Sequence, residues 1–92
     1  MEIVREREGK TDIQRLYRSK NGYGASVVRF KGSGILCLAT IQWQGEDFVI
    51  NERIGLKHKG SILDLTWTEV EDILKEIDTL RCPTPDWWEG MV

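Results

Sequence analysis

The hydrophobic period of the chain changes near residue 65, and this change limits the possible folds more than any other feature. Before it, short apolar or β-branched segments alternate with glycine-containing turns at regular spacing, which is typical of an antiparallel meander. After it, apolar residues recur at helical spacing, at Trp67, Val70, Ile73, Leu74, Ile77 and Leu80. The sequence therefore predicts an α+β fold in which a sheet precedes one amphipathic helix.

Four segments before the change carry the strand pattern. They are TDIQRLYRS, ASVVRF, ILCLATIQW and FVINERI, and together they span about residues 11–56. The third is so apolar that we expect it to be the central strand. Between the first two, Asn21-Gly22 is the strongest signal for a two-residue hairpin, because both positions of a type I′ turn need positive φ. The predicted order is a four-stranded antiparallel meander followed by one helix, ββββα.

The predicted helix spans about residues 66–80. Thr66-x-x-Glu69 forms a capping box at its start, and Thr68-x-x-Glu71 offers a second one nearby. Pro83 and Pro85 prevent the helix from continuing into the tail, residues 81–92. A chain of 92 residues is expected to form a single domain.

The net charge of −2 conceals an asymmetry along the chain. Residues 1–34 hold eight Lys or Arg against four Asp or Glu, whereas residues 61–92 hold two against eight. A nucleic acid that met only the N-terminal part would therefore encounter a cation. No apolar run approaches the roughly 20 residues that cross a bilayer, and the first residues lack the apolar segment of a signal peptide. We therefore expect a cytoplasmic protein without membrane contact.

The sequence contains no recognisable catalytic or metal-binding motif. Cys37 and Cys82 are not at metal-ligand spacing, and His58 stands between two lysines without a second histidine. We expect buried or inert cysteines and a structural or solvent-facing histidine. The chain is accordingly predicted not to be an enzyme and to need no cofactor or metal. The alternative is a nuclease that uses scattered carboxylates such as Asp47 and Glu52.

A single helix covers only one face of a sheet, so the other face must be polar or must meet a ligand, a partner or a second copy. Cations with flat rings on a sheet suit single-stranded DNA or RNA, because cations neutralise phosphates and rings stack on bases. The residues predicted to bind nucleic acid are Arg15, Tyr17, Arg29, Lys31, Trp43, Arg53, Lys57 and Lys59, with Tyr23 among them on the sheet. The alternative is an ordinary solvated face.

The loop Lys57-His58-Lys59-Gly60 also has two interpretations. It either contacts phosphate through Lys57 and Lys59 or simply leads into the helix. A homodimer is predicted as well, because one sheet face lacks a cover and Trp67, Trp87 and Trp88 are costly to expose.

Two stretches resemble the positive-cofactor-four family of single-stranded-DNA-binding proteins. They are SVVRFKG at residues 26–32 and KHKGSILDLTWTEVEDILKEID at residues 57–78. The resemblance implies a dimer of ββββα protomers in which the curved sheet binds single strands and the helices form part of the dimer interface. It also implies that Arg29, Lys31, Lys57 and Lys59 contact phosphate.

Two other stretches resemble small uncharacterised proteins of phages and mobile elements in Gram-positive bacteria. They are YRSKNGYGASVVR at residues 17–29 and LTWTEVEDIL at residues 65–74. This resemblance implies action inside a bacterial host, and it suggests an alternative function as a protein inhibitor of a host defence nuclease, similar to inhibitors of CRISPR nucleases. The partner-binding residues would then be Glu69, Glu71, Asp72, Glu76 and Asp78 as phosphate substitutes, with Trp87 and Trp88 as anchors.

Overall fold

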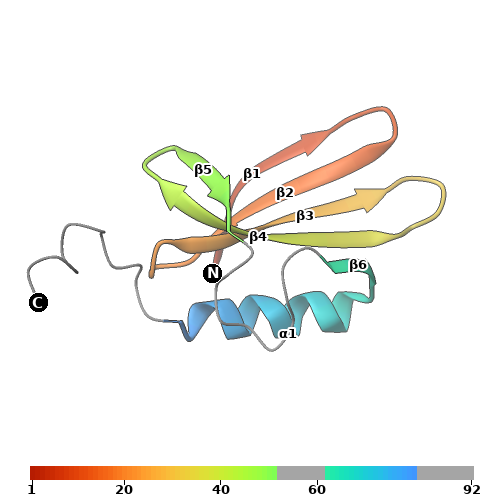
Figure 1. Ribbon diagram of the computed structural model, residues 1–92. Helices are drawn as coiled ribbons and strands as arrows, with labels where there is room; N and C mark the ends of the chain where they lie inside the picture. Colours follow the sequence, from red (N-terminus) through yellow and green to blue (C-terminus); the bar gives the residue numbers. More distant parts are fainter. Residues whose placement is uncertain (52–61, 81–92) are drawn as a thin grey trace, which may run out of the picture.

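The computed structural model describes residues 1–51 and 62–80, in which an antiparallel meander of five strands is followed by one helix (Figure 1). The elements are β1 (Glu2–Glu8), β2 (Asp12–Arg18), β3 (Tyr23–Phe30), β4 (Leu36–Gln44), β5 (Asp47–Ile50), β6 (Ile62–Leu65) and α1 (Trp67–Asp78). The strand order is β1-β2-β3-β4-β5, and β6 pairs with β4 as well. The predicted α+β class, the meander and the C-terminal helix are confirmed.

The sheet is larger than the sequence predicts, because β1 and β6 join it. All seven residues of β1 are exposed, so this edge strand lacks the apolar face from which the other strands were predicted. The short strand β6 places Leu65 opposite Leu36 of β4. The four predicted strands correspond to β2, β3, β4 and β5, although the second half of the last predicted segment lies outside the described residues.

The hairpin between β2 and β3 exists, but its predicted two-residue turn is wrong. The loop has three residues, Lys20 to Gly22, and it is closed by a hydrogen bond from the Ser19 N–H to the Tyr23 carbonyl at 2.8 Å. Gly22 has a φ of 91°, whereas Asn21 does not adopt positive φ. This is the three-residue hairpin loop with glycine in the left-handed region.

The main core lies between α1 and one face of the sheet, and Figure 1 shows the helix running along β3 and β4. The buried helix residues Val70, Ile73 and Ile77 have no exposed surface. They cluster with Tyr17, Ala25, Val27, Leu36, Leu38 and Leu65. Apolar burial of this kind contributes about 25 cal/mol per Å² and fixes which face of the sheet the helix covers.

The start of α1 uses the first of the two capping boxes. The Glu69 N–H donates to the Thr66 hydroxyl at 3.2 Å, and the Thr66 N–H donates to the Glu69 carboxylate at 3.0 Å. The helix ends at Asp78, two residues before the predicted boundary. Within the described residues, no helix is long and apolar enough to cross a membrane.

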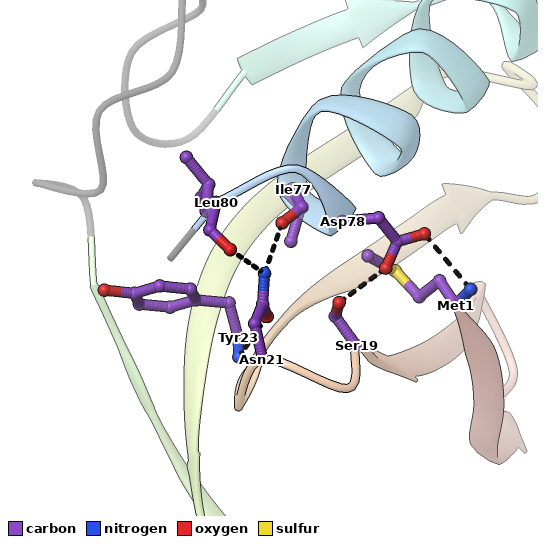
Figure 2. A network of polar contacts seen from close by, with 7 residues as sticks. All are labelled: Met1, Ser19, Asn21, Tyr23, Ile77, Asp78 and Leu80. Atoms are coloured by element: carbon purple, nitrogen blue, oxygen red, sulfur yellow. Dashed lines mark hydrogen bonds and ion pairs between the residues drawn. The ribbon is translucent and has the colours of Figure 1, made fainter. Parts of the chain in front are cut away.

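The C-terminal end of α1 is held by the loop between β2 and β3 (Figure 2). The Asn21 side-chain amide donates to the carbonyl oxygens of Ile77 at 2.7 Å and Leu80 at 2.9 Å. The Ser19 hydroxyl donates to Asp78 at 2.5 Å, and the N-terminal ammonium lies 3.1 Å from the same carboxylate. The loop thus supplies donors to the end of a helix, where backbone carbonyls lack intrahelical partners.

The second face of the sheet is partly covered by the protein itself. The indole of Trp43 lies against Gly24 and donates to the Tyr17 carbonyl at 2.9 Å. The Arg18 guanidinium stacks 4.3 Å from the centre of the Trp43 ring. Leu16 and Ile41 are buried on this face. Trp43 and Arg18 thus cover part of the face that was expected to be polar or to meet a ligand, a partner or a second copy, and that expectation stays a prediction.

Candidate functional site: an arginine–tryptophan cleft

A small cleft opens on the helix side of the sheet, at the end where α1 begins. Its lining comes from four strands and the helix and comprises Glu6, Ile13, Arg15, Val27, Arg29, Leu36 and Trp67. The lining combines apolar side chains of the sheet with two arginines and one tryptophan. We call it the arginine–tryptophan cleft.

The pairing of β2 with β3 places both arginines on the helix side. Arg15 is opposite Val27 and Ile13 is opposite Arg29, and directly opposite residues share a face. Because Val27 belongs to the core beneath α1, Arg15 and Arg29 lie on that side as well. The two arginines are diagonal neighbours, with their backbones roughly 7–8 Å apart. Both arginines accordingly line the same cleft.

Arg15 is held in place by contacts on two sides. Its guanidinium carbon lies 5.8 Å from the centre of the Trp67 ring, and its Nε lies 3.4 Å from a Glu6 carboxylate oxygen. The hydrogen bond to Tyr17 has the largest influence on the Arg15 pKa and raises this pKa. Burial lowers the pKa and Glu6 raises it, and the net result is a raised pKa. Arg15 therefore stays charged and partly ordered before any ligand arrives.

Arg29 and Trp67 provide the solvent-exposed surface of the cleft. Arg29 is exposed and forms no ion pair or hydrogen bond with another described residue. Trp67 is 43% exposed, which leaves part of its ring available for contact. A cation beside an exposed aromatic ring can bind a ligand that carries both an anionic group and a flat ring.

The structure separates the residues that were predicted to bind nucleic acid through one sheet face. Arg15 and Arg29 line the cleft, but Tyr17 is 7% exposed and belongs to the core. Lys31 follows β3, where its ammonium lies 3.3 Å from Glu8. Trp43 lies on the opposite face beneath the Arg18 guanidinium. The remaining three predicted residues, Arg53, Lys57 and Lys59, lie outside the described residues.

The acidic residues proposed for the alternative function lie mostly on the outer surface of α1. Glu69, Glu71, Asp72 and Asp78 are exposed, and Glu76 is half-buried. Glu69 also serves the capping box, and Asp78 accepts the hydrogen bond from Ser19. Trp87 and Trp88 lie outside the described residues. The outer surface of the helix is thus acidic.

Two residues of the cleft were not predicted to have a functional position. Trp67 was assigned to the buried face of the helix, but as the first helical residue it precedes the first buried position, Val70. Its position directly after the N-cap, before the first buried turn, could have indicated from the sequence that Trp67 is partly exposed. Glu6 was missed because β1 was not predicted, although Arg5 to Glu8 alternate in charge with the two-residue period of a strand.

Comparisons with known proteins identify no relative. No model of a protein family matches the chain, and no curated protein or solved structure matches it. The two resemblances noted in the sequence therefore stay predictions. The function has to be inferred from the cleft and from the charged surface around it.

Proposed function

We propose that the protein binds single-stranded nucleic acid in the arginine–tryptophan cleft. In this proposal it is a binding protein rather than an enzyme, and it acts for a phage or mobile element in the cytoplasm of the bacterial host. The observation that carries the proposal is the position of the exposed Trp67 ring beside Arg15, with Arg29 in the same cleft.

The cleft combines the two contributions on which single-strand binding depends. Guanidinium groups neutralise phosphate and can bind it with two parallel hydrogen bonds. An aromatic ring stacks on an unpaired base, and such a contact contributes about 1–3 kcal/mol per base. Bases in a duplex are already stacked on one another, so Trp67 favours an unpaired strand. Because Glu6 and Trp67 already orient Arg15, less side-chain entropy is lost on binding.

Two earlier predictions extend this proposal. Lys57 and Lys59 would add phosphate contacts beyond the cleft, although both lie outside the described residues. A homodimer would present two clefts to one strand and would raise the apparent affinity through effective concentration.

The experiment is a salt titration of oligonucleotide binding followed by fluorescence anisotropy, with single-stranded and double-stranded probes. Substitution of both cleft arginines, Arg15→Ala with Arg29→Ala, should flatten the log–log salt slope by about 1.4 if each contacts one phosphate. The matched control is Lys20→Ala with Lys75→Ala, which removes two exposed cations outside the cleft lining and should leave most of the affinity intact.

Trp67→Ala tests the aromatic contribution separately. It should weaken single-strand binding by roughly 1–3 kcal/mol and leave the salt slope nearly unchanged, because no phosphate contact is lost. Failure of the parent protein to bind any oligonucleotide at low salt would contradict the proposal. Equal loss of binding in the lysine control would show that only general charge matters.

The alternative, inhibition of a host defence nuclease, is favoured by the exposed acidic residues of α1. Carboxylates such as Glu71 and Asp72 could occupy the basic groove in which a nuclease holds nucleic acid. The test is DNA cleavage by an RNA-guided nuclease in the presence of the protein. Inhibition that disappears in Glu71→Lys with Asp72→Lys, but persists without the cleft arginines, would support this alternative over the first proposal.

A further inference from the structure

We infer that the arginine–tryptophan cleft binds the phosphorylated end of a strand rather than an internal segment. This inference rests on the proposed function and specifies its ligand: a terminal nucleotide whose base stacks on Trp67 and whose phosphate monoester lies between Arg15 and Arg29. Three features of the cleft support it, namely its number of cations, its single ring and the carboxylates around it.

The two guanidinium groups match the oxygens of a terminal phosphate better than those of an internal one, although Glu6 pairs with Arg15 and offsets one of their charges. A phosphate monoester carries about −1.5 to −2 at neutral pH, and it has three oxygens that accept hydrogen bonds. An internal phosphodiester has only two such oxygens outside its ester bonds. Because Arg15 and Arg29 are diagonal neighbours on one face, a single phosphate group can accept hydrogen bonds from both.

The described part of the cleft also provides only one stacking surface. Trp67 is the single aromatic residue among the described residues of its lining. Tyr17, the neighbour of Arg15 along the same face of β2, is buried in the core. Trp43 lies on the other side of the sheet, where its ring contacts Arg18 and Phe48. A strand that continued past Trp67 would therefore find no second ring among the described residues of the cleft.

Carboxylates border the cleft on two sides and oppose a continuing strand. Glu6 lines it from β1, and Glu8 follows on the same face of that strand. Glu71 comes one helical turn after Trp67, so both side chains lie on the same side of α1. The neighbouring cation Lys31 is already paired with Glu8. A second and a third phosphate would thus meet negative charge, whereas a strand end needs only the first.

The test compares four single-stranded oligothymidylates of equal length in anisotropy competition with the full chain. One carries a 5′-phosphate, one a 3′-phosphate and one only hydroxyl ends, and the fourth is circular. We expect whichever phosphorylated end fits the cleft to bind at least about tenfold more tightly than the hydroxyl-ended strand, because its phosphate adds charge-assisted hydrogen bonds to the guanidinium groups. The circular strand should bind no better than the hydroxyl-ended one.

Two further measurements connect the preference to the cleft. The preference should disappear in Arg15→Ala with Arg29→Ala and persist in Lys20→Ala with Lys75→Ala, with circular dichroism showing that each variant is folded. In the parent protein it should decrease below about pH 6, where a phosphate monoester loses its second charge. A preference that survives without both arginines would overturn the assignment to this cleft.

The outcomes also separate this inference from the proposed function. If the circular strand binds as tightly as the phosphorylated ones, the assignment to strand ends is wrong, while single-strand binding stands. If none of the four strands binds at low salt, both proposals fail.

Discussion

The side-chain amide of Asn21 donates a hydrogen bond to the Ile77 carbonyl oxygen at 2.7 Å and so joins the loop between β2 and β3 to the end of α1. The same amide donates to Leu80, and the Asn21 side-chain oxygen accepts from the Tyr23 N–H at 3.0 Å. One side chain thus closes the hairpin loop and caps the helix. Two elements that are far apart in the sequence depend on it.

Substitution of Asn21 should therefore destabilise the protein more than its place in a surface loop suggests. Asn21→Ala removes both donated hydrogen bonds and the acceptor for the Tyr23 N–H. At about 0.5–1.5 kcal/mol per hydrogen bond, the two donated bonds alone predict a loss of roughly 1–3 kcal/mol in the free energy of unfolding. Asn21→Asp keeps the acceptor for Tyr23 but places a negative charge at a helix C-terminus, so it should be at least as destabilising at neutral pH. Urea denaturation followed by circular dichroism measures both, with Lys10→Ala as an exposed control.

The two capping boxes in the sequence make different predictions. The structure uses Thr66 with Glu69, so Thr66→Ala should cost about 0.5–2 kcal/mol of stability. Thr68→Ala alters an exposed residue in the first turn of the same helix and should change stability by less than about 0.5 kcal/mol. Chemical denaturation of the two variants is sufficient, and equal losses would argue against the observed N-cap.

Gly24 leaves space for the Trp43 indole to lie against the face of the sheet. A Cβ at this position would collide with the Tyr17 carbonyl oxygen and lie 2.6 Å from the indole nitrogen. Gly24→Ala should therefore destabilise the protein by about 3 kcal/mol or more, since the backbone or the ring must move. Trp43→Phe removes only the hydrogen bond to Tyr17 and part of the ring, so a smaller loss is expected. Thermal unfolding that is unchanged in Gly24→Ala would contradict this packing.

The sequence was sufficient to predict those parts of the fold in which one face of an element is buried. The strands β2 to β4 and the helix α1 each contain buried residues, and the hydrophobic pattern detects them. In β5 only Phe48 is half-buried and the other residues are exposed, so this strand was predicted from its short apolar run alone. β1 has no buried residue: Arg5 and Arg7 lie on one face, Glu6 and Glu8 on the other, and all of them are exposed. An edge strand of this kind depends on backbone pairing, which the hydrophobic pattern does not report.

The candidate site could not be predicted because it depends on the register between strands. A two-residue turn at Asn21-Gly22 would pair Arg15 with Val28, whereas the observed three-residue loop pairs it with Val27. A shift of one residue moves every side chain of a strand to the other face. Under the predicted register, Arg15 and Arg29 would lie on opposite faces of the sheet. The loop length therefore brings the two arginines together.

Asp78 should make the stability of the protein depend on pH in the acid range. Burial raises the pKa of its carboxyl group. The hydrogen bond from Ser19 and the N-terminal ammonium lower this pKa by more than burial raises it, so the net pKa lies below the ordinary 3.8. A carboxyl group whose pKa is lower in the folded state stabilises the protein above its unfolded pKa, and this contribution is lost as the pH falls through the folded pKa. The loss should therefore occur below about pH 4.

Comparison of the parent protein with Asp78→Asn isolates this contribution, because both contain all the other carboxyl groups. The parent should be the more stable protein at neutral pH, and the difference in unfolding free energy should shrink as the pH falls from about 4 to about 2. Ser19→Ala provides the matched control: it removes the hydrogen-bond donor that lowers the Asp78 pKa in the folded state, so the acid-range loss should be smaller in this variant and complete at a higher pH. Urea denaturation across this range measures all three proteins. A difference between the parent and Asp78→Asn that stays constant down to about pH 2 would show that the contacts of Asp78 with Ser19 and the N-terminal ammonium do not stabilise its charged form.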